Sequence, residues 1–188
     1  MPKTITLPAP KPLAMTVTDA LAKRRSLRSF STQPLSDQEL ANLLWAAAGI
    51  TSPDGKRTAP SCLNLRAVTV FVLRADGSWR FDAEKNALEQ TTPEDLRALS
   101  TMGQHQFVDT APVTLVFVAE ETPRTKMARP SWVYLDAGAM VQNAYIAATA
   151  MGFGGVARGS VPCADLGARM KLPATFAPIF CFTCGHPA

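Results

Sequence analysis

The pattern of apolar and polar positions predicts two helices in the first quarter of the chain. The first is short and runs from Thr18 to about Arg25. The second is better marked, because Ser36 and Glu39 can form a capping box at its start and Gly49 ends it. Leu35 is expected to pack against the first apolar residue of this helix, whose predicted buried face comprises Leu40, Leu43, Leu44, Ala47 and Ala48.

Three runs of apolar residues further along the chain predict buried strands. These runs are Ala67–Leu73, Ala111–Ala119 and Ala177–Cys184, and they are rich in residues that favour strands. Turn-forming residues at Arg74–Ser78 follow the first run. The next segment, "WRFD" from Trp79, is therefore expected to begin a return strand.

Three later segments predict helices. One covers Thr92–Met102, a long and almost wholly apolar one covers Ser131–Met151, and a short one lies around Cys163–Met170. The side chains expected to face inward from the first are Leu96, Leu99 and Met102, and the glycines expected to end the second are Gly152, Gly154 and Gly155.

The order of these elements predicts an α+β fold with one central sheet, because helices come first and strands then alternate irregularly with helices. Residues 1–17 carry prolines at positions 2, 8, 10 and 12 and are expected to form an extended N-terminal arm. Residues 18–188 are expected to form one domain. A chain of 188 residues can bury a core without metals or disulfides.

Composition and charge argue against several classes of protein. The chain is 47% hydrophobic and 18% charged, which favours a globular protein over a disordered one. Four basic residues lie between Lys23 and Arg28, but the others are scattered among 15 acidic residues, which disfavours a nucleic-acid-binding surface. The longest apolar stretch is also unsuited to a membrane, because it contains Asp136, Gln142 and Asn143.

The cysteines are expected to be free thiols in a cytoplasmic protein, since the N-terminus shows no apolar run typical of a secretory signal. "CFTCGH", residues 181–186, resembles a redox or zinc motif. A buried strand would, however, place Cys181 and Cys184 on opposite faces, so we expect these cysteines to be structural.

Catalytic side chains are scarce in this sequence. His105 and His186 are its only histidines, and neither lies in a pattern typical of a hydrolase triad or a metal site. If the protein is an enzyme, a bound cofactor is expected to supply the reactivity.

Three segments are suited to an anionic, planar cofactor. "RRSLRSF" offers guanidinium groups and hydroxyls that match phosphate geometry, "APSCLN" presents polar groups on a rigid proline turn, and "GFGGV" lets backbone approach a ligand closely. Each also has a structural interpretation, since basic residues cap helix ends and glycines terminate helices. The candidate binding residues are Arg24, Arg25, Ser26, Arg28, Pro60, Ser61, Cys62, Leu63, Asn64, Gly154, Gly155 and Val156.

The combination and order of these segments resemble the nitroreductase superfamily of FMN-dependent oxidoreductases. The resemblance is strongest to SagB-like dehydrogenases and small nitroreductase-like proteins, and it runs from about Ala20 to Pro187. It rests on "RRSLRSF", "LSDQELANLLWAAAGI", "RTAPSCLNL", "FVDTAPVTLVFVA", "DAGAMVQNAYIAATAMGFGG" and a closing strand that ends in "GHP".

This resemblance implies a mostly antiparallel sheet flanked by helices, and a homodimer that holds one FMN at each subunit interface. It places Arg24 and Ser26 at the phosphate and Arg28 at the N1/O2 edge of the flavin, where its charge would stabilise the reduced ring. The loop from Pro60 to Asn64 falls on a second flavin-binding motif, and the backbone of residues 154–156 falls near N5. Many relatives have a Lys or Arg after the closing strand, and Arg158 is a candidate to replace it.

The implied reaction is ping-pong hydride transfer from NAD(P)H through flavin N5 to a nitroaromatic, quinone or similar small-molecule acceptor. Three alternatives remain open from the sequence. They are a SagB-like dehydrogenase that oxidises a heterocycle or a peptide, a flavin-binding protein without turnover, and an arginine-rich nucleic-acid module. Neither a metal nor a membrane partner is expected.

Overall fold

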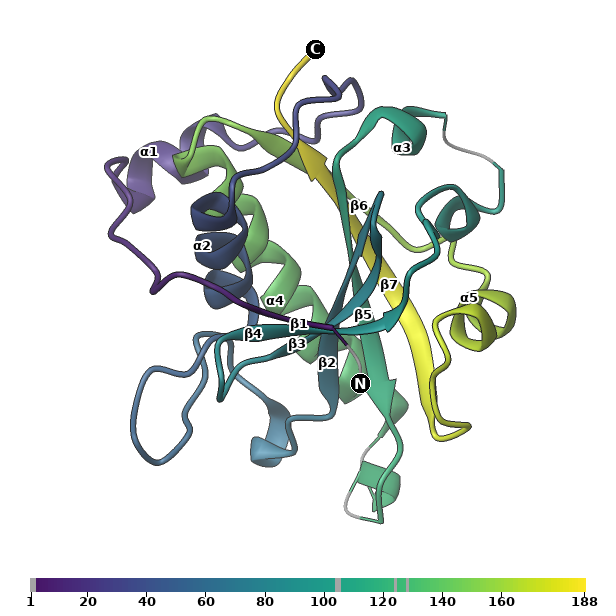
Figure 1. Ribbon diagram of the computed structural model, residues 1–188. Coiled ribbons are helices and arrows are strands. Elements are labelled where there is room, and N and C mark those ends of the chain that lie inside the picture. The colour runs from purple at the N-terminus through teal and green to yellow at the C-terminus, as the bar shows by residue number, and fades with distance from the viewer. Residues whose placement is uncertain (1–2, 104–105, 124, 128) are drawn as a thin grey trace.

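The computed structural model describes residues 3–103, 106–123, 125–127 and 129–188, and within them seven strands form one antiparallel sheet (Figure 1). The strand order is β1-β4-β3-β2-β5-β7-β6, so the last two strands in the sequence lie together at one edge. The strands are β1 (Thr4–Thr6), β2 (Val68–Arg74), β3 (Gly77–Asp82), β4 (Ala87–Thr92), β5 (Val113–Glu120), β6 (Gly154–Arg158) and β7 (Phe176–Gly185).

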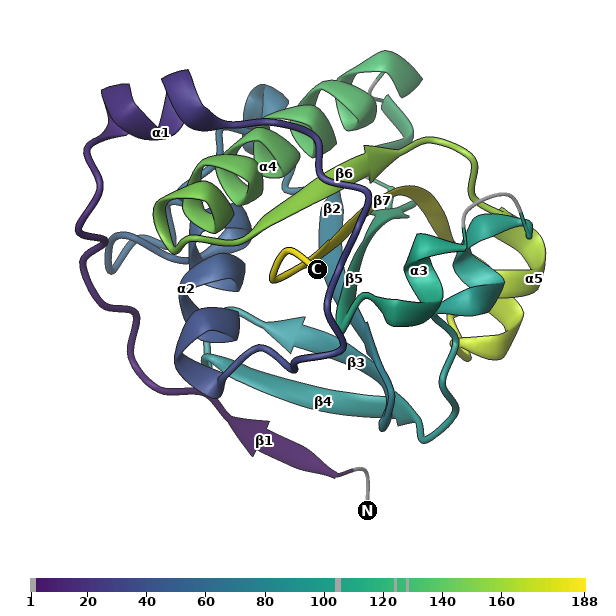
Figure 2. The same ribbon diagram turned by 90° about the horizontal axis from the view of Figure 1, so that it is seen from above.

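Helices cover both faces of the sheet. In Figures 1 and 2 the helices α2 and α4 lie on one face, and α3 and α5 lie on the other. The helices are α1 (Val17–Lys23), α2 (Asp37–Ala48), α3 (Phe107–Thr110), α4 (Pro130–Ala150) and α5 (Cys163–Arg169), with 3-10 turns η1 (Cys62–Asn64), η2 (Ala98–Thr101) and η3 (Thr125–Met127).

The structure confirms the nitroreductase-like α+β fold and several of its predicted elements. The predicted capping box of α2 is present, because Ser36 Oγ accepts from the Glu39 N–H and the Glu39 carboxylate accepts from the Ser36 N–H. Cys181 and Cys184 pack in separate core clusters on opposite sides of the sheet, as the strand pattern predicted. All four cysteines are free thiols.

The helix predicted over Thr92–Met102 is wrong. Thr92 ends strand β4, and only the 3-10 turn η2 follows. Leu96 is buried as predicted, but Met102 adopts a left-handed conformation and its side chain is 57% exposed. The local sequence was misleading because β4 consists mainly of polar residues, and its pairing with β3 and β1 decides its conformation.

The ends of the predicted sequence segments also differ in part. Gly152, with φ +83°, follows α4 as a terminating glycine, but Gly154 and Gly155 begin strand β6. The N-terminal arm includes β1, which adds to the sheet edge beside β4. Both short edge strands owe their conformation to pairing with distant segments.

Candidate functional site

The "RRSLRSF" segment leaves α1 and runs along the free edge of β6 (Figure 2). Ser26 forms an isolated parallel bridge with Gly155, and the Leu27 N–H donates to the Gly155 carbonyl at 2.9 Å. In extended backbone, side chains two residues apart share a side. Arg24, Ser26 and Arg28 are therefore expected to project from the same side of this edge segment.

Tyr145 on α4 connects this segment to β6. Its hydroxyl is hydrogen bonded to Ser26 Oγ at 3.1 Å and accepts from the Ala157 N–H at 2.8 Å. The Arg24 guanidinium lies over the Tyr145 ring, 5.0 Å from its centroid. One buried side chain thus holds the first and third predicted motifs together.

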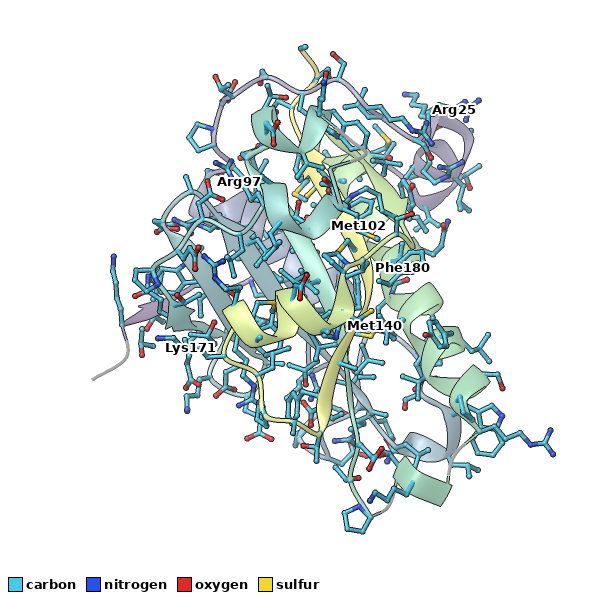
Figure 3. All side chains as sticks on the ribbon, turned by 90° about the vertical axis from the view of Figure 1, so that its right-hand side faces the viewer. Arg25, Arg97, Met102, Met140, Lys171 and Phe180 are labelled. Carbon is cyan, nitrogen blue, oxygen red and sulfur yellow. The ribbon has the colours of Figure 1, made fainter. Side chains whose placement is uncertain are left out.

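The basic cluster divides into residues with different surroundings. Arg25 extends outward at the edge of the molecule (Figure 3) and donates to the carbonyls of Ala22 and Arg24, so it caps the end of α1. Arg28 is exposed, and it makes no hydrogen bond or ion pair with the described residues. The capping interpretation therefore applies to Arg25, whereas Arg24 and Arg28 keep their guanidinium groups available.

Gly155 is required by packing within the sheet. A Cβ at this position would lie 2.5 Å from Phe182 Cζ and 2.6 Å from the Thr183 carbonyl oxygen. At Gly154 a Cβ would approach Leu27 Cβ to 3.2 Å. These glycines let β6 fit between β7 and the "RRSLRSF" segment, and Val156 beside them is buried.

The second predicted motif is anchored to α4 by Asp136, a buried carboxylate. Ser61 Oγ donates to Asp136 Oδ2 at 2.7 Å, and the Cys62 N–H donates to Oδ1 at 2.9 Å. Ser61 Oγ in turn accepts from the Arg66 N–H at 2.8 Å. Burial raises the pKa of the Cys62 thiol, and the hydrogen bond and charge of Asp136 raise it further. Cys62 is therefore held in its neutral form.

The loop from Pro60 to Arg66 is backbone-strained. Leu63, Asn64 and Arg66 all have φ between 50° and 54°, a left-handed region that costs energy for residues other than glycine. Leu63 is 72% exposed, and Asn64 accepts from Arg66 Nε at 2.9 Å. The fold thus holds the loop at the surface in a sparsely populated conformation, as is common at ligand-binding sites.

Two groups of predicted residues lie at separate places along α4. Asp136 holds the 60–64 loop, and Tyr145 holds the "RRSLRSF" segment. Nine residues of α-helix correspond to about 13 Å and two and a half turns, which places these two anchors on opposite sides of α4. Within one chain, the structure brings the first and third motifs together and keeps the second apart.

Arg158 does not replace the missing C-terminal cation. Its side chain is only 4% exposed, and it points into the core, where it donates to the Ser100 carbonyl, Ser100 Oγ and Thr183 Oγ. Burial lowers the pKa of Arg158. Because its donors are used in the core, a second phosphate ligand has to come from elsewhere.

Neither histidine takes part in an acid–base arrangement that the structure describes. His105 lies outside the described residues. His186 Nε2 lies 3.3 Å from Glu39 Oε1, and its ring packs edge-on to Phe153. Across the described ranges, no group of three His, Cys, Asp or Glu side chains could hold a metal ion. No helix in those ranges has the length and hydropathy needed to cross a membrane.

Sequence reasoning missed the two anchoring residues. Asp136 was noted only as an argument against a membrane helix, and Tyr145 was not singled out. A usable signal was present, because a carboxylate and a tyrosine hydroxyl in an apolar helix require hydrogen-bond partners when they are buried. The sequence could not reveal which partners those are.

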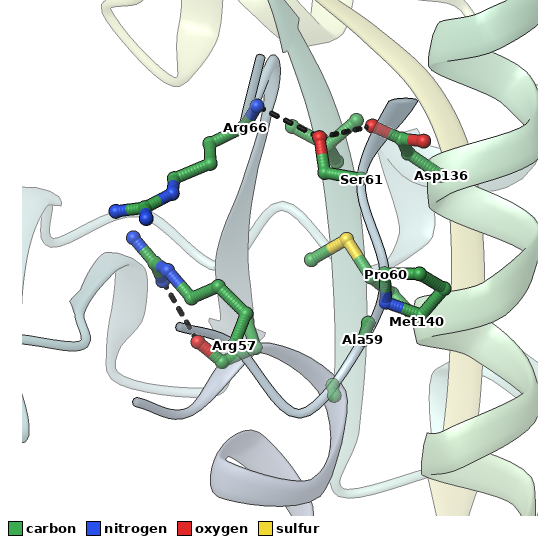
Figure 4. A pocket seen from close by; sticks show the side chains of 10 residues that line it. Arg57, Ala59, Pro60, Ser61, Arg66, Asp136 and Met140 are labelled. Carbon is green, nitrogen blue, oxygen red and sulfur yellow. Dashed lines mark hydrogen bonds between the residues drawn. The ribbon is translucent and has the colours of Figure 1, made fainter. Parts of the chain in front are cut away.

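A pocket lies behind the 60–64 loop (Figure 4). Pro60, Ser61, Asp136 and Met140 line one side, and the side chains of Arg57 and Arg66 lie across from them. This places two further cations beside the loop that the sequence analysis had singled out.

Comparisons with known proteins agree with this arrangement. A putatively assigned name aside, the chain is 31% identical over 154 residues to a nitroreductase-like protein of Methanocaldococcus jannaschii, covering 76% of this chain and 77% of that protein. A crystal structure of a nitroreductase-like protein from Ralstonia eutropha is 37% identical and has a TM-score of 0.91, with coverage of 98% of this chain and 90% of that one.

A third relative carries a cofactor in its crystal structure. The protein is a nitroreductase-like protein from Desulfovibrio desulfuricans in complex with FMN, 28% identical, with a TM-score of 0.68 and coverage of 92% of this chain and 86% of that one. The sequence model of the Nitroreductase family matches residues 21–186, which include all three predicted motifs. This chain belongs to the nitroreductase family.

Proposed function

We propose that this protein is an FMN-dependent oxidoreductase of the cytoplasm that uses NADH or NADPH to reduce a nitroaromatic, quinone or similar small acceptor. The observation that carries the proposal is the junction at Tyr145, where Arg24 and Ser26 meet strand β6. The four free cysteines agree with a reducing compartment. Residues 18–188 would form the FMN-binding domain.

The residues at this edge fit FMN by their chemistry. Arg24 and Ser26 offer a guanidinium and a hydroxyl, the donor types suited to a phosphate group. Arg28 is an exposed cation without a partner among the described residues, so it can face a group that becomes negatively charged on reduction. The backbone of residues 154–156 runs alongside these side chains.

Bound FMN would supply the redox chemistry, accepting a hydride at N5 and passing electrons to the acceptor. The chain's own residues would bind and orient it. Arg24 and Ser26 would hold the phosphate, and Arg28 would favour the reduced state electrostatically. Cys62, kept neutral by burial and by Asp136, would take no nucleophilic part.

A homodimer is part of this proposal. The 60–64 loop and the "RRSLRSF" segment are held on opposite sides of α4, so a cofactor that contacts both motifs would need the loop of a second copy. The exposed stripe of α4 supports the same conclusion, because Tyr134 and Leu135 project from it without cover.

An absorption spectrum followed by anaerobic titration with NADH and NADPH tests the proposal. We expect a yellow protein with extractable FMN that is bleached by at least one of the two donors. A protein that binds no FMN contradicts the proposal. Flavin that neither donor reduces would instead favour a dehydrogenase with another donor substrate, or a flavin carrier.

A further inference from the structure

Arg57 and Arg66 approach each other at the mouth of the pocket behind the 60–64 loop (Figure 4). Both are partly buried, and the proposed flavin chemistry uses neither of them. No ion pair joins either guanidinium to a carboxylate in the part of the chain that the structure describes. Two like charges thus lie side by side without a counterion.

The donors of these two arginines are only partly used. Arg57 donates from one terminal nitrogen to the Ala48 carbonyl at 2.8 Å, but its Nε is buried and has no partner. Arg66 uses its Nε on Asn64 and leaves its terminal nitrogens for another acceptor. Burial lowers the pKa of Arg57, and the neighbouring charge of Arg66 lowers it further.

A polar groove extends the pocket along β2 and β3. Arg57, Arg66 and Val68 line both hollows, and Arg80 adds a third cation to the groove. Asp82 and Glu84 also line it, but Asp82 is engaged by Lys85 Nζ at 3.0 Å and by two backbone N–H groups. The groove therefore retains unneutralised positive charge beside the loop.

An anion would resolve this arrangement. It would accept from the buried Arg57 Nε or from the terminal nitrogens of Arg66, and it would offset the repulsion between the two guanidinium groups. Guanidinium groups bind phosphate and carboxylate through paired hydrogen bonds, so these two anions are the best matched.

We propose that Arg57 and Arg66 form an anion-binding subsite that receives a phosphate or carboxylate group of the substrate. The inference rests on the proposed function, because it places this group next to the flavin-binding loop. Two sources share this chemistry. One is the 2′-phosphate that distinguishes NADPH from NADH, and the other is a carboxylate on the electron acceptor.

Calorimetric titration of the oxidised, FMN-loaded protein with two matched pairs of probes tests the subsite. NADP⁺ is compared with NAD⁺ for the phosphate source, and 4-nitrobenzoate with nitrobenzene for the carboxylate source. We expect the wild-type protein to bind the more anionic member of at least one pair about tenfold more tightly. The pair that shows the preference identifies the source.

Arg66→Gln is the principal variant, because Arg57 also supports the end of α2 through Ala48 and its loss could disturb the fold. Arg66→Gln should abolish the preference, and Arg66→Lys should restore part of it. The matched control is Arg74→Gln, which removes one positive charge at the far end of β2, where Arg74 pairs with Asp76. This control should keep the preference.

Three results would overturn the subsite. They are the absence of a preference in both pairs, a preference that Arg66→Gln retains, and a loss of FMN in Arg66→Gln, which would assign the arginines to the cofactor itself. A wild-type protein that carries no FMN refutes the proposed function instead. Normal FMN content and normal reduction without an anion preference refute the subsite alone.

Discussion

Tyr145 shows how one side chain can organise a cofactor site without contacting the reacting atoms. Its hydroxyl joins Ser26 to the backbone of β6, and its ring supports Arg24. The edge-on packing of Phe182 against the ring, at 4.7 Å between centroids, holds Tyr145 in place. The orientation of the proposed phosphate ligands therefore depends on a residue buried beneath them.

Tyr145→Phe should weaken FMN binding while it keeps the ring under Arg24. Loss of a hydrogen-bonded hydroxyl costs about 1 kcal/mol, which corresponds to roughly a fivefold increase in the Kd for FMN. Fluorescence titration of the apoprotein with FMN measures this change. Tyr134→Phe, on the exposed side of the same helix, is the control and should bind FMN normally. Equal affinities in the two variants would contradict the positioning role.

Arg24 and Arg28 should differ in their dependence on redox state. Arg28→Ala should lower the midpoint potential by about 30 to 65 mV, because a charge-assisted hydrogen bond of about 1.5 to 3 kcal/mol would be lost from the reduced state alone. Arg24→Ala should weaken FMN binding in both states, since the charge of the phosphate does not change. Spectroelectrochemical titration separates the two effects. Wild-type potential and flavin content in both variants would exclude this segment from the cofactor site.

At the scale of elements, α4 serves as the scaffold for the strained 60–64 loop. Asp136 accepts from Ser61 Oγ and from the Cys62 N–H, and both bonds hold a turn that includes left-handed non-glycine residues. Without these bonds the loop would relax toward more populated backbone conformations. The helix thus stabilises a surface loop that the local sequence does not favour.

Asp136→Ala should lower both stability and FMN content. The variant leaves the partly buried Ser61 hydroxyl and Cys62 N–H without their acceptor, at a cost of about 1 to 3 kcal/mol. In a chain of this size, each 1 kcal/mol lowers Tm by about 2 to 4 °C. Thermal unfolding and flavin extraction measure the two effects. Asn143→Ala, which removes a 3.3 Å hydrogen bond to the Thr58 carbonyl from the same helix, should have the smaller effect.

At the scale of the whole molecule, the exposed stripe on α4 indicates where a second copy would pack. Leu135 is 65% exposed, Tyr134 is also exposed, and nothing lies within 4 Å of a Cβ placed at Gly138. Such a stripe on an apolar helix is costly in water. Dimerisation through α4 would bury it and bring each 60–64 loop toward the other copy.

Leu135→Lys should convert the protein to monomers and lower its FMN content. Light scattering of the wild-type protein is expected to give twice the 20.2 kDa mass of the chain, and the variant should give the single-chain mass. Val17→Lys, which adds the same charge at an exposed apolar position on α1, is the control. A wild-type protein that is monomeric and fully loaded with FMN would refute the shared site.

Short-range features of this protein could be predicted from its sequence. The capping box of Ser36 and Glu39 and the apolar runs of β2, β5 and β7 depend on neighbouring residues, so each element is encoded where it forms. The motif order from Arg24 to Gly155 was equally local, and it was sufficient to predict the family. Strand β4 and the turn after it were not predictable in this way, because their polar sequence acquires its conformation from β1 and β3.

The arrangement of the candidate site was decided only by the tertiary structure. Asp136 reaches Ser61 across 75 positions of sequence, and Tyr145 reaches Ser26 across 119. Arg25, Arg28 and Arg158 are chemically identical side chains, yet one caps a helix, one is exposed and one is buried in the core. The sequence determined which groups were available, but the solvation and partners of each group arise from packing between distant segments, which no local pattern records.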